Sequence, residues 1–137
     1  VYEPGERFTI GKGKLLRDGG DLTIFASGIM VAEALTAADI LAERGVSARV
    51  VDLFTWKPID TELITRCAAE TKRFIVAENH NVYGGLGSAV AEVTAKTCPV
   101  PIQFVGVDDQ FGQVGTQAEL QKAYNLTAAA IVVAALQ

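Results

Sequence analysis

Short apolar runs alternate along this chain with longer segments of helical periodicity, and this alternation constrains the fold more than any other feature. The runs are Leu22 to Ala26, Arg49 to Leu53, Phe74 to Ala77 and Ile102 to Val107. Because they are apolar almost throughout, they are typical of strands covered on both faces. The pattern predicts four buried parallel strands joined by crossover helices.

The segments between these runs carry the spacing and the end signals of helices. An apolar stripe of Val31, Ala34, Leu35, Ala38, Leu41 and Ala42 predicts a first helix, which Gly45 ends. Further helices are expected after Asp60 as a cap, near Gly87 or Ser88, and after Thr127. Helices therefore follow strands in regular succession.

The N-terminal region predicts one more strand. Lys12 to Arg17 is followed by Asp18-Gly19-Gly20, which favours a hairpin leading into Leu22. The expected fold is α/β, a three-layer α/β/α arrangement around an open, mostly parallel five-stranded sheet with one antiparallel edge strand. We expect residues 1–11 to be an incoming linker and residues 12–137 to form one domain.

Composition excludes several classes of protein. Half of the 137 residues are apolar and a fifth are charged, which suits a single globular domain. The net charge of −4 and the scattered Lys and Arg argue against nucleic-acid binding. No apolar run approaches the roughly 20 residues of a membrane span. Cys67 and Cys98 are expected to be buried reduced thiols in a cytoplasmic protein, and the start at Val1 suggests a fragment.

The loop from Glu78 to Ser88 is the segment richest in chemistry. Ligands of open α/β sheets bind where strands end at their carboxyl side. The candidate residues there are Glu78, His80, Tyr83, Gly84, Gly85, Gly87 and Ser88. A glycine-rich turn before a helix offers amides to an anion, but Val90 stands where a dinucleotide fingerprint has Gly or Ala. Tight turning and close helix approach explain the glycines better than anion binding does.

No catalytic constellation is evident. His80 is the only histidine and has no Ser or Cys nucleophile beside it, so a structural or interface role is favoured, although Glu78 could orient it. Caps and strand-end charges account for the other charged candidates, which are Arg44, Asp52, Lys57 and Asp60. The adjacent Asp108 and Asp109 are expected to diverge.

Three segments together resemble the C-terminal domain of transketolases. They are Leu53-Phe54-Thr55-Trp56-Lys57-Pro58-Ile59-Asp60-Thr61-Glu62-Leu63-Ile64, Thr71-Lys72-Arg73-Phe74-Ile75-Val76-Ala77-Glu78-Asn79-His80 and Tyr83-Gly84-Gly85-Leu86-Gly87-Ser88-Ala89-Val90. The first is similar to the family's Phe-Thr-x-Lys-Pro-Leu/Ile-Asp run. The second and third are similar to its Glu-Asp/Asn-His followed by a Gly-Gly-x-Gly turn.

The resemblance implies a dimeric enzyme that uses thiamine diphosphate and Mg²⁺ to transfer a two-carbon ketol unit between sugar phosphates, as in pentose phosphate metabolism. The cofactor, its metal and the activating glutamate belong in that family to N-terminal and central domains or to a separate subunit. No catalytic, cofactor or metal residue is therefore carried over to this chain, and the isolated domain is predicted to be inactive. We expect the Glu78 to Ser88 loop to meet such a partner domain or subunit.

Three alternatives stay open. Deoxyxylulose phosphate synthases and pyruvate dehydrogenase beta chains share this domain, but more often show Glu-Glu-Gly where this chain has Glu78-Asn79-His80. The chain could instead be a stand-alone small-anion or nucleotide-binding module that uses Gly84 to Ser88. It could also be a purely structural dimerisation module.

Overall fold

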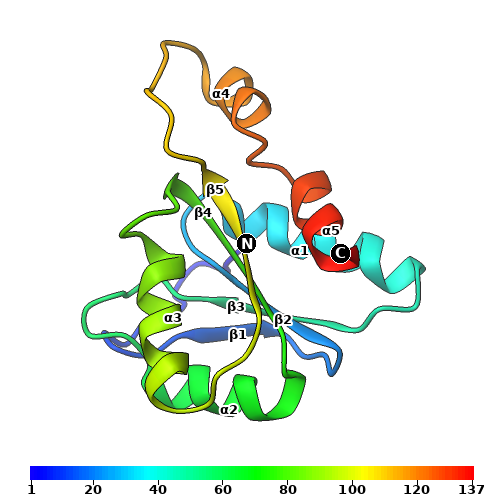
Figure 1. Cartoon of the computed structure of the whole chain (residues 1–137), viewed down its shortest axis with the longest axis vertical. Helices are drawn as coiled ribbons and strands as arrows, with labels where there is room; N and C mark the ends of the chain where they lie inside the picture. The colour runs from blue at the N-terminus through cyan, green and yellow to red at the C-terminus, as the bar shows by residue number, and fades with distance from the viewer.

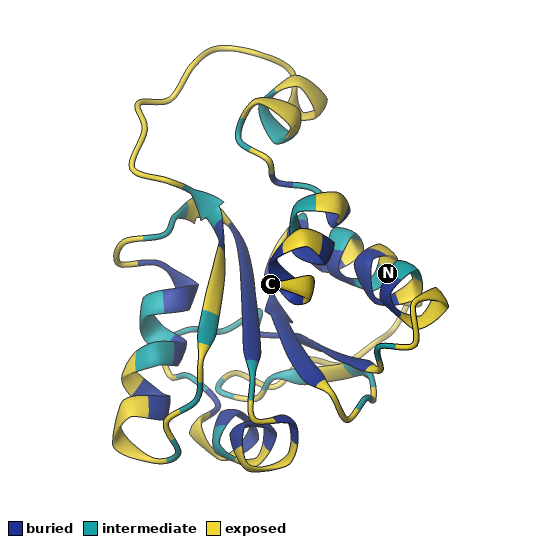
Figure 2. Ribbon diagram, turned by 45° about the vertical axis from the view of Figure 1, so that its right-hand side comes forward, coloured by how far each residue is buried: buried dark blue, intermediate teal, exposed yellow.

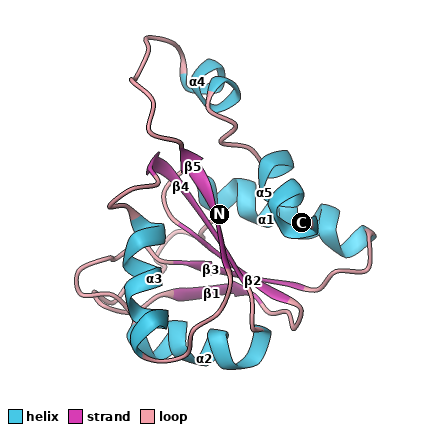
Figure 3. Cartoon of the chain, in the orientation of Figure 1, coloured by secondary structure: helices cyan, strands magenta, loops and turns pink.

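The computed structural model describes all residues from 1 to 137. The elements in chain order are β1 (Lys14–Arg17), β2 (Leu22–Ala26), α1 (Met30–Glu43), β3 (Ala48–Asp52), α2 (Thr61–Thr71), β4 (Phe74–Asn81), α3 (Leu86–Lys96), β5 (Ile102–Val107), α4 (Gln117–Ala123) and α5 (Ala128–Leu136). Figures 1 and 3 show helices on both faces of one twisted sheet. None of the helices has the length and apolar character needed to cross a bilayer.

The sheet has the strand order β1-β3-β2-β4-β5. Strand β2 lies parallel to both β3 and β4, and β4 lies parallel to β5, whereas β1 is antiparallel to β3. The predicted α/β class, the five-stranded sheet and its single antiparallel edge strand are confirmed. This topology brings the carboxyl ends of four parallel strands to one end of the sheet.

Two apolar cores lie on opposite faces of the sheet. Helices α1 and α5 pack on one face around Ile24, Leu41 and Ile131. Helices α2 and α3 pack on the other around Phe25, Ile64 and Val90. Since β2 is covered on both faces, each of its residues is buried, as its apolar sequence predicted.

The helix end signals act as expected. The Asp60 side chain accepts a hydrogen bond from the backbone N–H of Leu63 and thereby caps α2. Thr127 caps α5 in the same way through the N–H of Ala130. Gly45, which follows α1, has a φ of 78°. Local sequence therefore sets where these helices begin and end.

The predicted hairpin between the first two strands is wrong. Strand β1 pairs with β3, and Lys14 faces Asp52 while Arg17 faces Val50. The connection crosses the start of β3 so closely that a Cβ on Gly19 would lie 2.4 Å from the carbonyl carbon of Ala48. Glycine is thus required for this crossing rather than for a tight turn.

Three further expectations need correction. Strand β5 lies at the sheet edge, and its residues Gln103 and Phe104 are exposed rather than buried. Cys98 follows α3 and is only half-buried, whereas Cys67 is buried. Helix α4 was not predicted, although its Thr116 and Glu119 form a capping box that the sequence displays.

The first eleven residues contact the domain although they form no helix or strand. The ring of Phe8 packs edge-on between Tyr2 and Phe54, with centroid separations of 4.8 and 5.0 Å. The ammonium of Lys14 lies over the rings of Tyr2 and Phe8. These contacts place the N-terminal segment beside the loop that follows β3.

Candidate functional site

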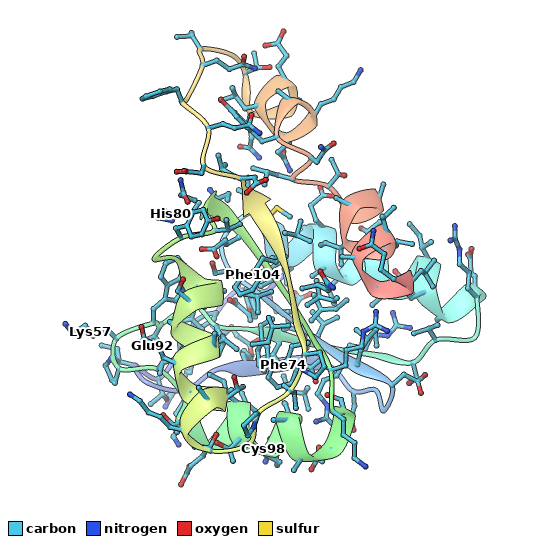
Figure 4. All side chains as sticks on the ribbon, in the orientation of Figure 1. Lys57, Phe74, His80, Glu92, Cys98 and Phe104 are labelled. Atoms are coloured by element: carbon cyan, nitrogen blue, oxygen red, sulfur yellow. The ribbon has the colours of Figure 1, made fainter.

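The loop that follows β4 lies at the carboxyl end of the sheet, where ligand sites of open α/β folds occur. It joins β4 to α3 and contains the predicted candidate Tyr83, whereas Glu78 and His80 lie in the last part of β4 and Ser88 lies in the first turn of α3. Figure 4 shows His80 near one end of β4 and Phe74 toward the other. The structure therefore gathers the candidates at one end of the sheet but separates their side chains by burial.

Glu78 is buried and holds the first turn of α3. Its Oε2 accepts a hydrogen bond from the N–H of Leu86 at 2.6 Å, and its Oε1 accepts one from Gly87 at 2.9 Å. The first amides of a helix have no partner within the helix, and the helix dipole favours negative charge there. Glu78 therefore acts as an N-terminal cap supplied by a neighbouring strand.

Two glycines make room for this arrangement. A Cβ on Gly85 would lie 2.0 Å from the Glu78 Oε2, and one on Gly87 would lie 2.2 Å from the Phe104 ring. Such distances are far below van der Waals contact. The Gly-x-Gly spacing thus permits α3 to approach both the Glu78 carboxylate and strand β5.

His80 is exposed and does not contact Glu78. The β4–β5 register shifts between Ala77 and Asn81, so the regular alternation of side chains is interrupted between Glu78 and His80. The His80 Nδ1 lies 3.0 Å from the carbonyl oxygen of Asn81, and its ring meets Trp56 edge-on with centroids 6.3 Å apart. The idea that Glu78 orients His80 is wrong, because both Glu78 oxygens bind α3.

The remainder of the loop is tied together internally. The Asn81 Oδ1 accepts a hydrogen bond from the N–H of Tyr83 at 2.9 Å. The Ser88 hydroxyl accepts one from the N–H of Gly84 at 2.9 Å and donates to the carbonyl of Val82. The Tyr83 side chain is 70% exposed. The loop is thus a pre-shaped surface with an aromatic ring directed to solvent.

Asp52 is a buried carboxylate whose partner the sequence did not reveal. Its Oδ2 accepts a hydrogen bond from the Tyr2 hydroxyl at 2.5 Å, while its Oδ1 has no hydrogen-bond partner. Burial raises the pKa of Asp52, although the Tyr2 hydrogen bond and the Lys14 charge oppose that shift. The pKa of Tyr2 is raised by its burial and by Asp52. Tyr2 was missed because it lies in the segment assigned as a linker.

The remaining charged candidates have separate surroundings. Asp60 caps α2 and also accepts a hydrogen bond from the N–H of Gly13 at 3.0 Å, whereas Lys57 and Arg44 are exposed. Asn81 Nδ2 donates to Asp109 Oδ1 at 3.4 Å. No group of three or more His, Cys, Asp or Glu side chains has the proximity that a metal ion requires. The groups that this region exposes to solvent include the His80 imidazole and the Tyr83 phenol.

Comparisons with known proteins identify the family. The family described as Transketolase, C-terminal domain, matches residues 11–131. The 6-deoxy-6-sulfo-D-fructose transketolase subunit SqwH of Clostridium sp. (strain MSTE9) is 52% identical over 98% of this chain. A 1-deoxy-D-xylulose-5-phosphate synthase of Heliobacterium modesticaldum is 42% identical over 87% of the chain.

A solved structure described as a split gene transketolase, inactive beta4 tetramer, has a TM-score of 0.95 and 48% identity over 99% of this chain. The chain spans only 42% of the Clostridium protein, 18% of the Heliobacterium protein and 45% of the solved chain. Each relative thus contains much sequence beyond the region that this chain matches. On the family match and these identities, the chain belongs to the transketolase C-terminal domain family.

Proposed function

We propose that this chain is the C-terminal domain of one subunit of a two-subunit transketolase, in which it supports assembly of the thiamine-diphosphate enzyme. The observation that carries this proposal is the 52% identity over nearly the whole chain to a protein described as a transketolase subunit. The solved relative described as a split gene transketolase supports it. The partners are the thiamine-binding domains or subunit and a second copy of this chain.

The domain does not fit thiamine diphosphate in its own glycine-rich turn. An anion at the start of α3 would need the amides of Leu86 and Gly87, and the Glu78 carboxylate already binds both. A diphosphate placed there would also face the negative charge of Glu78. In the complete enzyme the cofactor supplies the carbon centre that carries the ketol unit, and we assign its binding to the other domains.

The substrates we propose are ketoses and aldoses with an anionic group remote from the reacting carbonyl. The sequence resemblance favours sugar phosphates, as in pentose phosphate metabolism. The Clostridium relative is described as acting on 6-deoxy-6-sulfo-D-fructose, a sugar that carries a sulfonate. Both kinds of donor therefore belong in the same assay.

We assign the loop from Glu78 to Ser88 to a contact with a neighbouring domain or subunit near the cofactor cleft. Exposed His80 and Tyr83 combine aromatic surface with hydrogen-bonding groups, a mixture enriched where protein surfaces meet. Hydrogen bonds from the backbone N–H groups of Tyr83 and Gly84 to the side chains of Asn81 and Ser88 hold this surface in shape before a partner binds. Pre-organisation of this kind lowers the entropic loss on binding.

The proposal is tested by expressing the subunit that contains this domain together with its thiamine-binding partner. Two-carbon transfer to an aldose phosphate is measured with a ketose phosphate and with 6-deoxy-6-sulfo-D-fructose as donors. Turnover is expected only when the subunits are combined. Formation of 1-deoxy-D-xylulose 5-phosphate would instead favour the synthase, the function in the name of the relative that is 42% identical. Turnover by the 137-residue chain alone would overturn the proposal.

A further inference from the structure

Asp52 is a buried carboxylate whose side chain forms no hydrogen bond to any helix or strand. Figure 2 shows the inner strands of the sheet buried and most loops exposed. Asp52 is the last residue of β3, and only 4% of it is exposed. Its Oδ1 is the one buried side-chain oxygen or nitrogen without a hydrogen-bond partner. Because burial of an unpaired carboxylate oxygen disfavours the charged form, ionised Asp52 is poorly accommodated in this position.

The group that reaches Asp52 comes from the N-terminal segment, residues 1–11. The Tyr2 hydroxyl donates a hydrogen bond to the Asp52 Oδ2 at 2.5 Å. Tyr2 is the only one of the first ten residues that is not exposed. No backbone hydrogen bond joins residues 1–8 to the rest of the chain. Side chains therefore hold the segment on the domain, and Tyr2 makes its innermost contact.

The other contacts of the segment lie nearer to solvent. The Phe8 ring is 46% exposed and packs edge-on between Tyr2 and Phe54. Glu6 forms an ion pair with Lys14, whose ammonium also lies over the rings of Tyr2 and Phe8. Ion pairs that water can reach contribute little to stability. Docking of the segment therefore depends strongly on the contact between Tyr2 and Asp52.

The elements that pack beside β3 place no other charge against Asp52. Ala26 is its partner in β2. In α1, the Glu33 carboxylate accepts a hydrogen bond from the first amide of α5, and Asp39 forms an ion pair with β1. The Asp60 carboxylate before α2 binds backbone amides. The titratable groups that bear on Asp52 are therefore Tyr2 and Lys14, together with the Glu6 carboxylate that pairs with Lys14.

We propose that the contact between Tyr2 and Asp52 is a pH-sensitive latch for the N-terminal segment. With Asp52 protonated, the neutral carboxyl group stays buried beneath Tyr2 and residues 1–11 remain docked. With Asp52 ionised, the segment separates, and water hydrates the Oδ1 that has no partner in the docked state. Release also uncovers Phe54 in the loop after β3. The latch needs only a proton from solvent, and it is independent of the transketolase assignment.

The direction of the pH dependence follows from burial. Burial raises the pKa of Asp52 in the docked state, although the Tyr2 hydrogen bond and the Lys14 charge oppose the rise. Release exposes the carboxyl group to water and returns its pKa toward the ordinary value of about 3.9. The docked state therefore binds the proton more tightly, so a rise in pH favours release. The ratio of docked to released chains falls about tenfold for each unit of difference between the two pKa values.

Nuclear magnetic resonance of the 137-residue chain measures the ionisation of Asp52 and the position of the segment in one sample. The ¹³Cγ shift of Asp52 follows its ionisation. The proton shifts of the Tyr2 and Phe8 rings report docking, because these rings lie edge-on to each other. Between about pH 3 and 8, both sets of shifts should change with one midpoint above the ordinary aspartate value of about 3.9. The ratio of docked to released chains should fall at least about tenfold over this range.

Three variants identify the group responsible. Asp52→Asn cannot ionise but keeps an acceptor for the Tyr2 hydroxyl, so its segment should stay docked over the whole range. Glu6→Gln is the matched control, because it removes the other carboxylate that pairs with Lys14, and it should keep the wild-type midpoint. Tyr2→Ala removes the innermost contact, so its Phe8 shifts provide the reference for a released segment.

Ring shifts that stay constant while Asp52 ionises would overturn the inference, as would an Asp52 that titrates at or below about 3.9. An unchanged pH dependence in Asp52→Asn would also overturn it, and loss of the pH dependence in Glu6→Gln would assign the switch to Glu6 instead. Far-UV circular dichroism checks that each variant is folded, and the wild-type titration decides the inference if a variant is not. Because no turnover is measured, these outcomes are independent of the transketolase assay.

Discussion

Replacing Glu78 by Gln isolates the contribution of one buried carboxylate to the fold around the candidate loop. In the wild type, the N–H groups of Leu86 and Gly87 each donate to one oxygen of the Glu78 carboxylate. Glutamine has nearly the same size but only one acceptor oxygen, so its NH₂ group must face one of these two N–H groups. Glu78→Gln therefore loses one charge-assisted hydrogen bond and leaves one buried donor unpaired. It also removes the favourable charge at the start of α3.

These effects give the magnitude. A hydrogen bond to a charged group contributes about 1.5–3 kcal/mol, and loss of the charge at a helix start about 0.3–1 kcal/mol. The free energy of unfolding should fall by about 2–4 kcal/mol, against a total of about 7–20 kcal/mol expected for a domain of this length. The loss is large enough to measure with the variant still folded.

Urea unfolding followed by circular dichroism measures this difference, and an unchanged m-value would show that the unfolding reaction is the same. Amide hydrogen exchange gives a local readout, because the amides of Leu86 and Gly87 should exchange faster in the variant. Glu92→Gln is the matched control, since Glu92 is exposed on the same helix and should leave stability nearly unchanged. A loss below about 0.5 kcal/mol for Glu78→Gln would refute the capping role.

Three other predictions concern pH, assembly and the cofactor. Burial raises the pKa of Asp52, so the folded state binds the proton of this carboxyl group more tightly than the unfolded state does. Ionisation of Asp52 therefore lowers the free energy of unfolding as the pH rises above about 4, the ordinary pKa of an aspartate. Asp52→Asn should therefore gain stability relative to the wild type between pH 4 and 7, and parallel unfolding curves for the two proteins would contradict this. In the complete enzyme, His80→Ala and Tyr83→Ala should weaken dimerisation or cofactor retention by about 1–3 kcal/mol with little change in the chemical step; an intact dimer with kcat lowered about 100-fold by His80→Ala would make that histidine catalytic. Calorimetry of this chain with thiamine diphosphate and Mg²⁺ should show no saturable heat, and micromolar binding would refute our assignment of the cofactor to other domains.

The sequence was most informative about structural features that depend on residues adjacent in the chain. Strand β2 and the capping of α2 by Asp60 follow from local apolar runs and a local hydrogen bond. The order of strands and helices also restricts the connections to right-handed crossovers, so the α/β class could be predicted. The motif around His80 identified the family because its residues are contiguous.

Contacts between distant segments could not be read from the sequence. The apolar run of β5 resembles that of β2, yet β5 lies at an edge, because an apolar run does not state how many neighbours a strand has. The pairing of β1 with β3 and the hydrogen bond from Tyr2 to Asp52 each join residues far apart in the chain.

The role of Glu78 illustrates the same division. The sequence placed a carboxylate, a histidine and a glycine turn in one loop, but a shift in the β4–β5 register decided that Glu78 points into the domain and His80 out of it. Local chemistry thus determined which groups are available at the end of the sheet. Only the packing of β4 against β5 and α3 decided which of them stabilise the fold and which remain free to meet a partner.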